Sequence, residues 1–263
     1  MNLNALRHFL LALQFFTRIP VTGRLAAWVG YSPQMLRASA AHFPGVGWIV
    51  GGVAAAVFVA ASQGLPPLAA ALLSTVATVW LTGAFHEDGL ADVADGLGGS
   101  AQRERALEIM KDSRIGAFGA IALVLALGLK VALLAAVAQQ GAASVVAALF
   151  AAHVLSRLAP LFLIRFLPYV GDSGASKSKP LADAIGGGAL AVGILWSIPA
   201  AAPVLIAQGA MKTGAMLLAV VAAGAWMAGL FRRRLQGFTG DGLGATQQVC
   251  ELAVYGVLAW RLA

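Results

Sequence analysis

Acidic residues gather in one short part of this 263-residue chain. Seven of its 11 Asp and Glu residues lie between positions 87 and 112, namely Glu87, Asp88, Asp92, Asp95, Glu104, Glu108 and Asp112. If residues 82–96 are a helix that continues unbroken from the apolar segment before them, a turn of about 100° per residue places Asp88, Asp92 and Asp95 on one stripe roughly 60° wide. Like charges at these spacings repel each other, so the pattern predicts a bound cation. Carboxylate-only sites suit Mg²⁺, Mn²⁺ or Ca²⁺, and Mg²⁺ is commonly shared with substrate phosphates.

Neighbouring residues extend this candidate metal site. Glu87 is a further candidate ligand beside Asp88, and Asp241, in the sequence G-D-G-L-G-A, is either another ligand or the cap of a helix. His86 is a ligand, a general base or an interfacial residue, and Asp88 is the other candidate base. The competing interpretation is a solvated loop at a membrane edge. The striping of the acids and the glycines that flank them favour the metal site.

Basic residues close the same stretch and could bind a phosphate. Lys111 and Arg114 are three residues apart, which places them on one face if they begin the next helix, where anions are favoured. The alternative is that their charge only sets the membrane topology. Lys177 and Lys179, in S-K-S-K-P, are candidates for contacting an anionic substrate or lipid head groups.

The composition predicts a membrane protein. The chain is 60% hydrophobic and only 11% charged, with a mean hydropathy of +0.83, whereas soluble domains carry about 25% charged residues. Several apolar blocks exceed the roughly 18 residues that cross a bilayer as a helix. Backbone groups in lipid must bond within their own segment, and the alternating pattern of a barrel is absent. We therefore expect an all-α polytopic membrane protein.

Seven apolar segments are candidate transmembrane helices. They cover residues 43–63, 67–85, 115–138, 143–166, 185–208, 213–231 and 245–262. Residues 3–17 are interpreted as a retained amphipathic helix at the interface, with a short first span as the alternative. The whole chain, 1–263, is treated as a single membrane-embedded catalytic domain, with a cytoplasmic N-terminal segment (1–42) and a cytoplasmic acidic active-site loop (86–114).

The distribution of basic residues orients these spans. Of 18 Lys and Arg residues, 14 fall on the side of the N-terminus and the long loops, and two fall on the other side. The positive-inside rule places the first side, with the acidic loop, in the cytoplasm. The same rule accounts for the net charge of +7, so no nucleic-acid partner is expected.

Four ionisable residues lie inside predicted spans, where charge is expensive and marks a site or cavity. They are Lys130, His153, Arg157 and Glu251. Arg157 is a candidate for binding substrate phosphate, and a structural ion pair with Glu251 is the competing interpretation. Lys130 has no assigned partner.

Five motifs occur in order along nearly the whole chain: L-Q-F-F-T-R-I-P (13–20), F-P-G-V-G (43–47), G-A-F-H-E-D-G-L-A-D-V-A-D-G (83–96), M-K-D-S-R-I-G-A-F-G (110–119) and G-D-G-L-G-A (240–245). Together they resemble the cobalamin synthase family, the adenosylcobinamide-GDP ribazoletransferases of bacterial membranes. The resemblance implies a Mg²⁺-dependent transfer in which α-ribazole, or its 5′-phosphate, attacks a corrinoid nucleotide diphosphate and GMP leaves. In that reaction Asp88, Asp92 and Asp95 would hold the metal, while Lys111 and Arg114 would stabilise phosphate charge.

The resemblance also implies a setting. It places the enzyme in the bacterial cytoplasmic (inner) membrane, in contact with lipid and with its active site facing the cytoplasm. A homo-oligomer and an association with other enzymes of nucleotide-loop assembly both stay open.

Two other function classes compete with this expectation. A CDP-alcohol phosphatidyltransferase shares the spacing of Asp92, Asp95 and Gly96, but Gly99 and Ser100 stand where that signature has Ala and Arg. An ion-coupled transporter would explain the charges inside the spans but not the concentration of acids at one face.

Overall fold

The structure is a computed structural model that describes residues 3–171 and 185–260, and the regular secondary structure within these ranges is helical. Within the described residues, β-type pairing is limited to one isolated parallel bridge between Tyr169 and Phe238. The elements are α1 (Leu3–Phe16), α2 (Gly23–Val29), α3 (Pro33–Ser39), η1 (Ala40–His42), α4 (Phe43–Ala61), α5 (Pro67–Thr82), α6 (Phe85–Gly99), α7 (Arg103–Ile109), α8 (Ala117–Ala138), α9 (Ala142–Phe166), α11 (Gly187–Ser197), η2 (Ile198–Ala200), α12 (Ala201–Arg234) and α13 (Gly240–Ala259).

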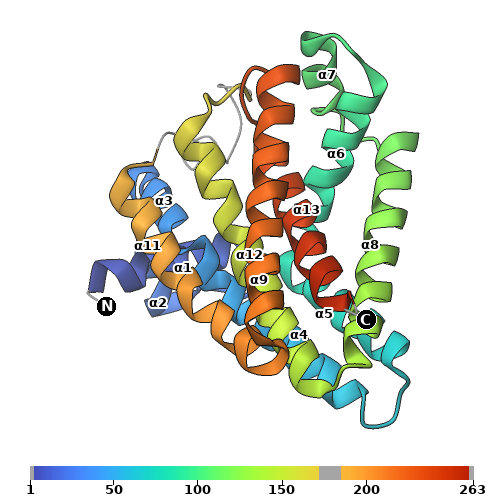
Figure 1. Cartoon of the computed structure of the whole chain (residues 1–263). Helices are drawn as coiled ribbons and strands as arrows, with labels where there is room; N and C mark the ends of the chain where they lie inside the picture. The colour runs from blue at the N-terminus through green and yellow to red at the C-terminus, as the bar shows by residue number, and fades with distance from the viewer. Residues whose placement is uncertain (1–2, 172–184, 261–263) are drawn as a thin grey trace.

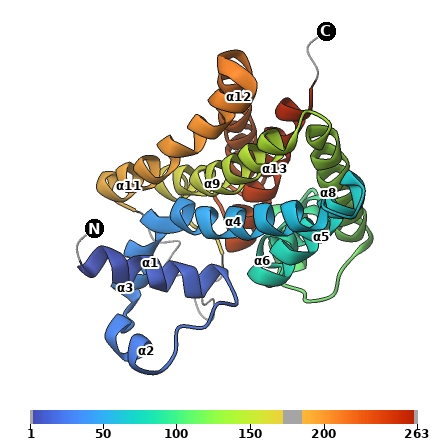
Figure 2. The ribbon, with the colours of Figure 1, turned by 90° about the horizontal axis from the view of Figure 1, so that it is seen from below.

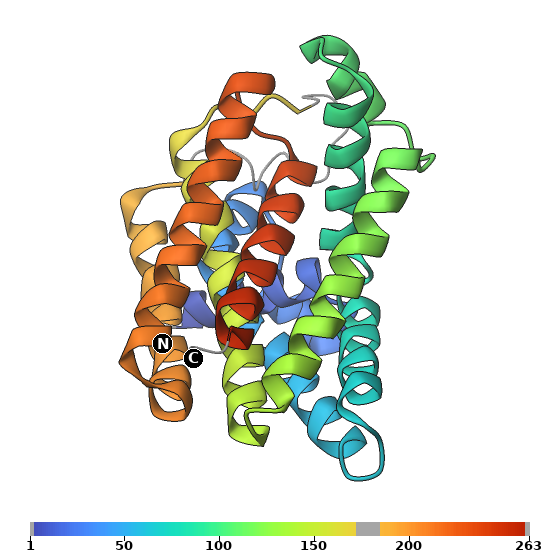
Figure 3. The same ribbon diagram turned by 45° about the vertical axis from the view of Figure 1, so that its right-hand side comes forward.

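The helices form one bundle in which α13 is central. Figures 1 and 3 show α13 between α12 on one side and the pair α6 and α8 on the other, and α13 packs on α6, α8, α9 and α12. Four continuous helical stretches of the described chain are long and apolar enough to cross a membrane, and the bent pair α5–α6 would make a fifth. Helices occupy all seven predicted segments, but the count of about seven spans is not confirmed.

The second predicted span does not continue straight into the acidic helix. Gly83 and Ala84 both have positive φ, 68° and 59°, and the axes of α5 and α6 differ by 89°. Gly83 accepts a left-handed conformation at no steric cost. The expected unbroken helix is therefore wrong at this point, and the bend directs α6 along α13 and α8.

Close helix packing depends on glycine at one central crossing. A Cβ atom at Gly47 of α4 would lie only 2.4 Å from the carbonyl oxygen of His153 in α9. Any larger residue would therefore push apart two helices that pack together extensively. The second glycine of the F-P-G-V-G motif is thus required for the close packing of α4 on α9.

The N-terminal helices lie beside this bundle. The prediction of a helix over residues 3–17 is confirmed by α1, which lies with α2 and α3 outside the main helices (Figure 2). The end of α1 turns inward, because Leu13 and Phe16 are buried in a cluster with Phe43 and Leu161. This packing places the aromatic residues of the first motif next to the start of α6.

Candidate active site

Three acidic side chains lie close enough to repel one another where α6 crosses the beginning of α13. A Cβ atom at Gly89 would lie 2.7 Å from the carbonyl oxygen of Asp241, so the two backbones are in contact there. Asp88 is exposed and Asp92 and Asp241 are partly buried. The carboxylate of Asp92 is repelled by those of Asp241 and Asp88. We call Asp88, Asp92 and Asp241 the carboxylate site.

The structure decides one of the two predicted roles of Asp241, that of helix cap. Its neighbour Thr239 caps α13, because the Thr239 hydroxyl accepts a hydrogen bond from the amide of Gly242. The N-cap interpretation of Asp241 is therefore wrong. Burial, with repulsion by Asp88, raises the pKa of Asp241 to about 6. At neutral pH Asp241 is therefore mostly ionised, and its negative charge lies close to that of Asp88. A bound cation would relieve the repulsion between them.

Asp95 lies on the predicted stripe, but its carboxylate serves another purpose. One oxygen accepts a hydrogen bond from the amide of Gly116 at 2.7 Å, and the other accepts from the amide of Gly119 at 2.8 Å. These amides lie at the start of α8, where backbone N–H groups lack helical partners and favour negative charge. The buried Asp95 therefore fastens α8 to α6. A Cβ atom at Gly119 would lie 2.3 Å from this carboxylate, so any larger residue at position 119 would clash with Asp95.

Glu87 also faces away from the carboxylate site. Its side chain is buried, and it accepts a hydrogen bond from the Gln248 amide of α13 at 3.1 Å. Successive residues of a helix point about 100° apart, so Glu87 enters the core while Asp88 faces outward. Because Glu87 and Asp95 are both turned to other partners, we retain Asp88, Asp92 and Asp241 as the candidate metal ligands.

The described residues contain no group of three His, Cys, Asp or Glu side chains already arranged around a metal position. The donor set of the carboxylate site nevertheless suits Mg²⁺, which is commonly held by one or two carboxylates and completed by water and substrate phosphates. The repulsion among the three side chains is the observation that favours a cation here.

The segment before α8 is not helical, and it contains both Lys111 and Arg114. The prediction that these two residues share one face of a helix is therefore wrong. The chain turns there because Asp112 accepts hydrogen bonds from the backbone and the guanidinium of Arg114. This pairing lowers the pKa of Asp112 to about 2. Both basic side chains are exposed. Arg114 also borders a hollow of about 480 Å³ that includes Asp95. Lys177 and Lys179 lie outside the described residues.

A second polar group lies in the bundle interior. Lys130 of α8 and Glu251 of α13 form an ion pair at 2.7 Å, with side chains 3% and 2% exposed. Glu251 also accepts hydrogen bonds from Tyr255 and Gln247. The ion pair of Glu251 with Arg157, the competing interpretation of Arg157, is not formed; the cations beside Glu251 are Lys130 and, at 3.7 Å, the ring of His153 if it is protonated. The partner of Lys130 was not predicted, since nothing in the sequence aligned α8 with α13.

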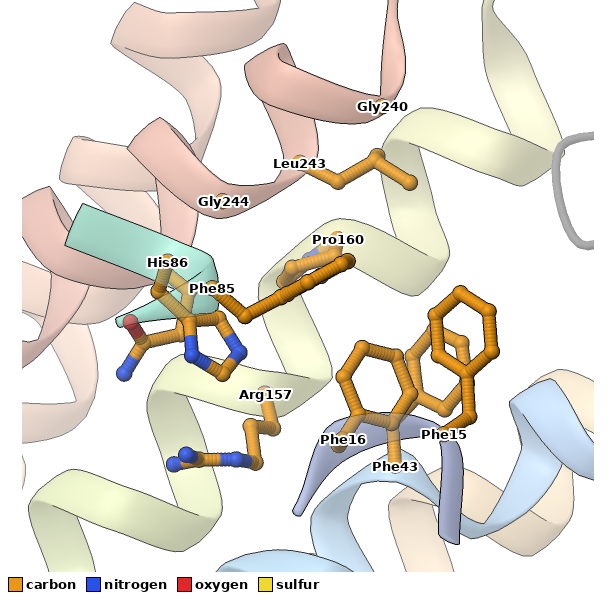
Figure 4. Close-up of a pocket in the computed structure, with 11 residues that line it drawn as sticks. Phe15, Phe16, Phe43, Phe85, His86, Arg157, Pro160, Gly240, Leu243 and Gly244 are labelled. Carbon is orange, nitrogen blue, oxygen red and sulfur yellow. The ribbon is translucent and has the colours of Figure 1, made fainter. Parts of the chain in front are cut away.

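Arg157 turns toward its own helix and a neighbouring pocket. Its guanidinium donates to the carbonyl oxygen of His153 at 2.8 Å, while its Nε has no partner within the described ranges. Figure 4 shows Arg157 at one end of this pocket, with His86 above it and phenyl rings to the side. His86 is buried, and its ring stacks on Phe16 with centroids 5.9 Å apart. His86 is therefore not exposed at the interface.

These observations define the class of protein: an all-helical membrane protein with a carboxylate site beside an aromatic pocket. The chain belongs to the cobalamin-5-phosphate synthase family, whose sequence model matches residues 8–259. Proteins named adenosylcobinamide-GDP ribazoletransferase are similar to it in Albidiferax ferrireducens (62% identity over 95% of this chain and 96% of the relative) and in Polaromonas naphthalenivorans (60% over 99% and 100%). No solved structure matches the chain.

Proposed function

We propose that this chain is a Mg²⁺-dependent adenosylcobinamide-GDP ribazoletransferase of the bacterial inner membrane. It joins the corrinoid nucleotide diphosphate to α-ribazole or its 5′-phosphate and releases GMP. The family membership and the relatives' names support the reaction. The observation that carries the proposed site is the close packing of α6 on the start of α13, which brings Asp88, Asp92 and Asp241 near enough to repel one another. The excess of basic residues on that side of the membrane supports a cytoplasmic orientation.

Each group has a definite task in this proposal. Asp88, Asp92 and Asp241 would hold Mg²⁺, which would neutralise charge on the diphosphate. Lys111 and Arg114, exposed before α8, would bind phosphate oxygens and the departing GMP. Asp88, at the exposed edge, or His86, in the aromatic pocket, would accept the proton of the attacking hydroxyl. The bond that forms joins this oxygen to the corrinoid phosphorus, and the bond that breaks frees GMP.

Nucleotide release from the purified protein in detergent or liposomes tests this reaction. We expect GMP and the cobalamin product in equal amounts from adenosylcobinamide-GDP and α-ribazole, and neither product without Mg²⁺. Release of CMP from a CDP-alcohol, with no GMP from the corrinoid, would instead identify a lipid-synthesising enzyme. No nucleotide from either donor would contradict both reactions and favour the transporter interpretation.

Proton competition at Asp241 gives a second test. Because the pKa of Asp241 is raised to about 6, its carboxylate is protonated below that pH and charged above it. Asp92, another proposed ligand, has a pKa that burial and its acidic neighbours raise to about 7, so protons compete at both carboxylates. We expect the apparent Kd of Mg²⁺ to rise about tenfold between pH 7 and pH 6 and about 100-fold for each pH unit below 6, measured by calorimetry without substrate. Asp241→Asn should bind Mg²⁺ weakly and keep only the weaker pH dependence that Asp92 gives. An unchanged pH profile in that variant would exclude Asp241 as a ligand.

The same shift predicts how the metal-free protein responds to pH. The pKa of an Asp side chain is about 4 in the unfolded chain, whereas that of Asp241 is about 6 in the folded protein. The folded state therefore binds the proton more tightly, and the fold loses stability as pH rises from about 4 through about 6. The melting temperature of metal-free protein should therefore fall over this range. Mg²⁺ should restore it at pH 7.5 but not at pH 5. Asp241→Asn should show a smaller fall, because Asp92, whose pKa burial and acidic neighbours raise to about 7, still contributes.

A further inference from the structure

A groove between α9 and α12 has no part in the chemistry described so far. The two helices pack together and end at the same end of the bundle (Figures 1 and 3). Between them lies a hollow of about 550 Å³. Its walls include Leu158, Phe162 and Phe166 of α9 and Val221, Ala225 and Arg232 of α12. We call this hollow the α9–α12 groove.

The α9–α12 groove opens onto an apolar surface. Phe162, Phe166 and Val221 are large apolar residues of its walls, and all three are exposed. After its first turn, α9 exposes only Phe162, Arg165 and Phe166. The most buried of the long helices therefore reaches the surface at this groove. Exposed apolar surface of this kind marks a contact with lipid or with another protein.

Arginines stand at one end of the groove. Arg232 lines it from the last turn of α12, and the other lining residues are apolar. Arg165, in the last turn of α9, lies beside it, with its guanidinium carbon 5.7 Å from the ring centroid of Phe166. Both arginines are exposed, and neither guanidinium has a hydrogen-bond or ion-pair partner in the part of the chain that the structure describes. The groove is thus cationic at one end and apolar along the rest.

The length of the groove matches one leaflet of a bilayer. Along α12 it extends from Val220 to Arg232, which spans about 18 Å at 1.5 Å per residue. The hydrocarbon of one leaflet is about 15 Å deep, which is half of a core of about 30 Å. The arginines lie on the side of the membrane that carries most of the basic residues, and the positive-inside rule places that side in the cytoplasm.

We propose that the α9–α12 groove binds an acyl chain of an anionic phospholipid from the cytoplasmic leaflet, with the lipid phosphate on Arg232 and Arg165. The planar fork of a guanidinium matches two phosphate oxygens. Basic pockets between membrane helices on the cytoplasmic side bind anionic lipid head groups. This inference requires that α9 and α12 lie in a membrane, and it does not depend on the proposed reaction.

A second copy of the chain fits this groove less well. Copies in one membrane share the same orientation, so a symmetric pair that met at the groove would place both Arg232 side chains at the same depth. Like charges at close range repel each other, whereas a lipid phosphate neutralises them. The charge at the end of the groove therefore favours a lipid.

Native mass spectrometry of the full-length protein in detergent tests the head-group contact. The protein is titrated with phosphatidylglycerol and, separately, with phosphatidylcholine. We expect Arg232→Gln to raise the Kd of the tightest-bound phosphatidylglycerol about fivefold, which corresponds to roughly 1 kcal/mol, and to leave phosphatidylcholine binding unchanged. Arg24→Gln removes the same charge from an exposed position on α2 outside the groove and should change neither Kd. Equal phosphatidylglycerol affinities in Arg232→Gln and wild type would overturn the inference.

A ring added inside the groove tests the acyl-chain contact. Ala225 is exposed on the wall of the groove, and Ala222, one turn earlier on α12, is exposed outside it. We expect Ala225→Phe to lose the tightest-bound phosphatidylglycerol and the matched control Ala222→Phe to retain it. Glycerol 3-phosphate, which has the phosphate but no chains, should not displace the lipid.

Three outcomes would contradict the acyl-chain contact. Equal lipid binding in Ala225→Phe and Ala222→Phe would show that the chain lies elsewhere. Displacement of the lipid by glycerol 3-phosphate would show that phosphate alone is recognised. A dimer of lipid-free wild type that Ala225→Phe converts to a monomer would assign the groove to a second copy.

Discussion

Asp92→Asn should abolish turnover while leaving the protein folded in the membrane. Asp92 lies one turn after Asp88 on α6 and close to Asp241 of α13, and both carboxylates repel it. Replacing its charge with an amide removes a predicted Mg²⁺ ligand and the negative charge that attracts the metal. We expect GMP release to fall at least about 100-fold, which corresponds to roughly 3 kcal/mol of barrier. Single-turnover measurement at saturating substrates and Mg²⁺ would show the loss in kcat.

Glu104→Gln is the matched control for this substitution. Glu104 belongs to the same acidic stretch, but its side chain is 80% exposed on α7 and pairs with Arg103. Its removal changes the net charge by the same amount and should leave kcat unchanged. If Asp92→Asn retains activity within about threefold of wild type, less than 1 kcal/mol, then the carboxylate site does not hold the catalytic metal.

Lys130→Met should strongly destabilise the bundle. The ion pair of Lys130 with Glu251 is almost fully buried, and removing one partner leaves the other charge without compensation. Such losses cost about 3–5 kcal/mol of unfolding free energy. Unfolding in mixed micelles of increasing denaturing detergent would measure the change. The double variant Lys130→Met with Glu251→Gln should recover part of the loss, because neither member of the pair is then charged, although buried Arg157 also loses the nearby charge of Glu251.

The exposed pair of Arg105 and Glu108 is the control for burial. Its 2.6 Å distance is close to that of the buried pair, but its side chains are 59% and 68% exposed. Arg105→Met should therefore change stability by less than about 1 kcal/mol. If the double variant in the bundle is no more stable than Lys130→Met, then the ion pair is not the source of the effect, and lost packing of the lysine chain must account for it.

Hydrophobicity and helical periodicity predicted the elements well because both are local properties of the sequence. The apolar blocks became helices, and the stripe of Asp88 and Asp92 follows directly from 3.6 residues per turn. The bend between α5 and α6 was missed, although Gly83 is the residue that permits it. A single glycine inside an apolar helix does not by itself predict a break, because neighbouring helices decide where the chain turns.

The partners of the acidic residues could not be predicted from the same patterns. Asp95 shares a face with Asp88 and Asp92, yet it binds the amides of Gly116 and Gly119. The glycines of the M-K-D-S-R-I-G-A-F-G motif were a signal for this contact, since bare backbone N–H groups often receive a carboxylate. Glu251 and Lys130 lie on helices whose pairing depends on the whole bundle, so their contact required the structure.

Adjacent residues of α6 face two different environments. Glu87 accepts a hydrogen bond from Gln248 inside the bundle, while Asp88 is exposed beside Asp241. One turn of α6 therefore connects the proposed site to the bundle interior. The hydrogen bond between Gln248 and Glu87 helps to fix the rotation of α6 about its axis. The orientation of Asp88 can then be changed by a substitution in the interior, with no change to an acidic residue. Substitutions at Gln248 would therefore change how α6 presents Asp88 while every candidate metal ligand stays in the sequence.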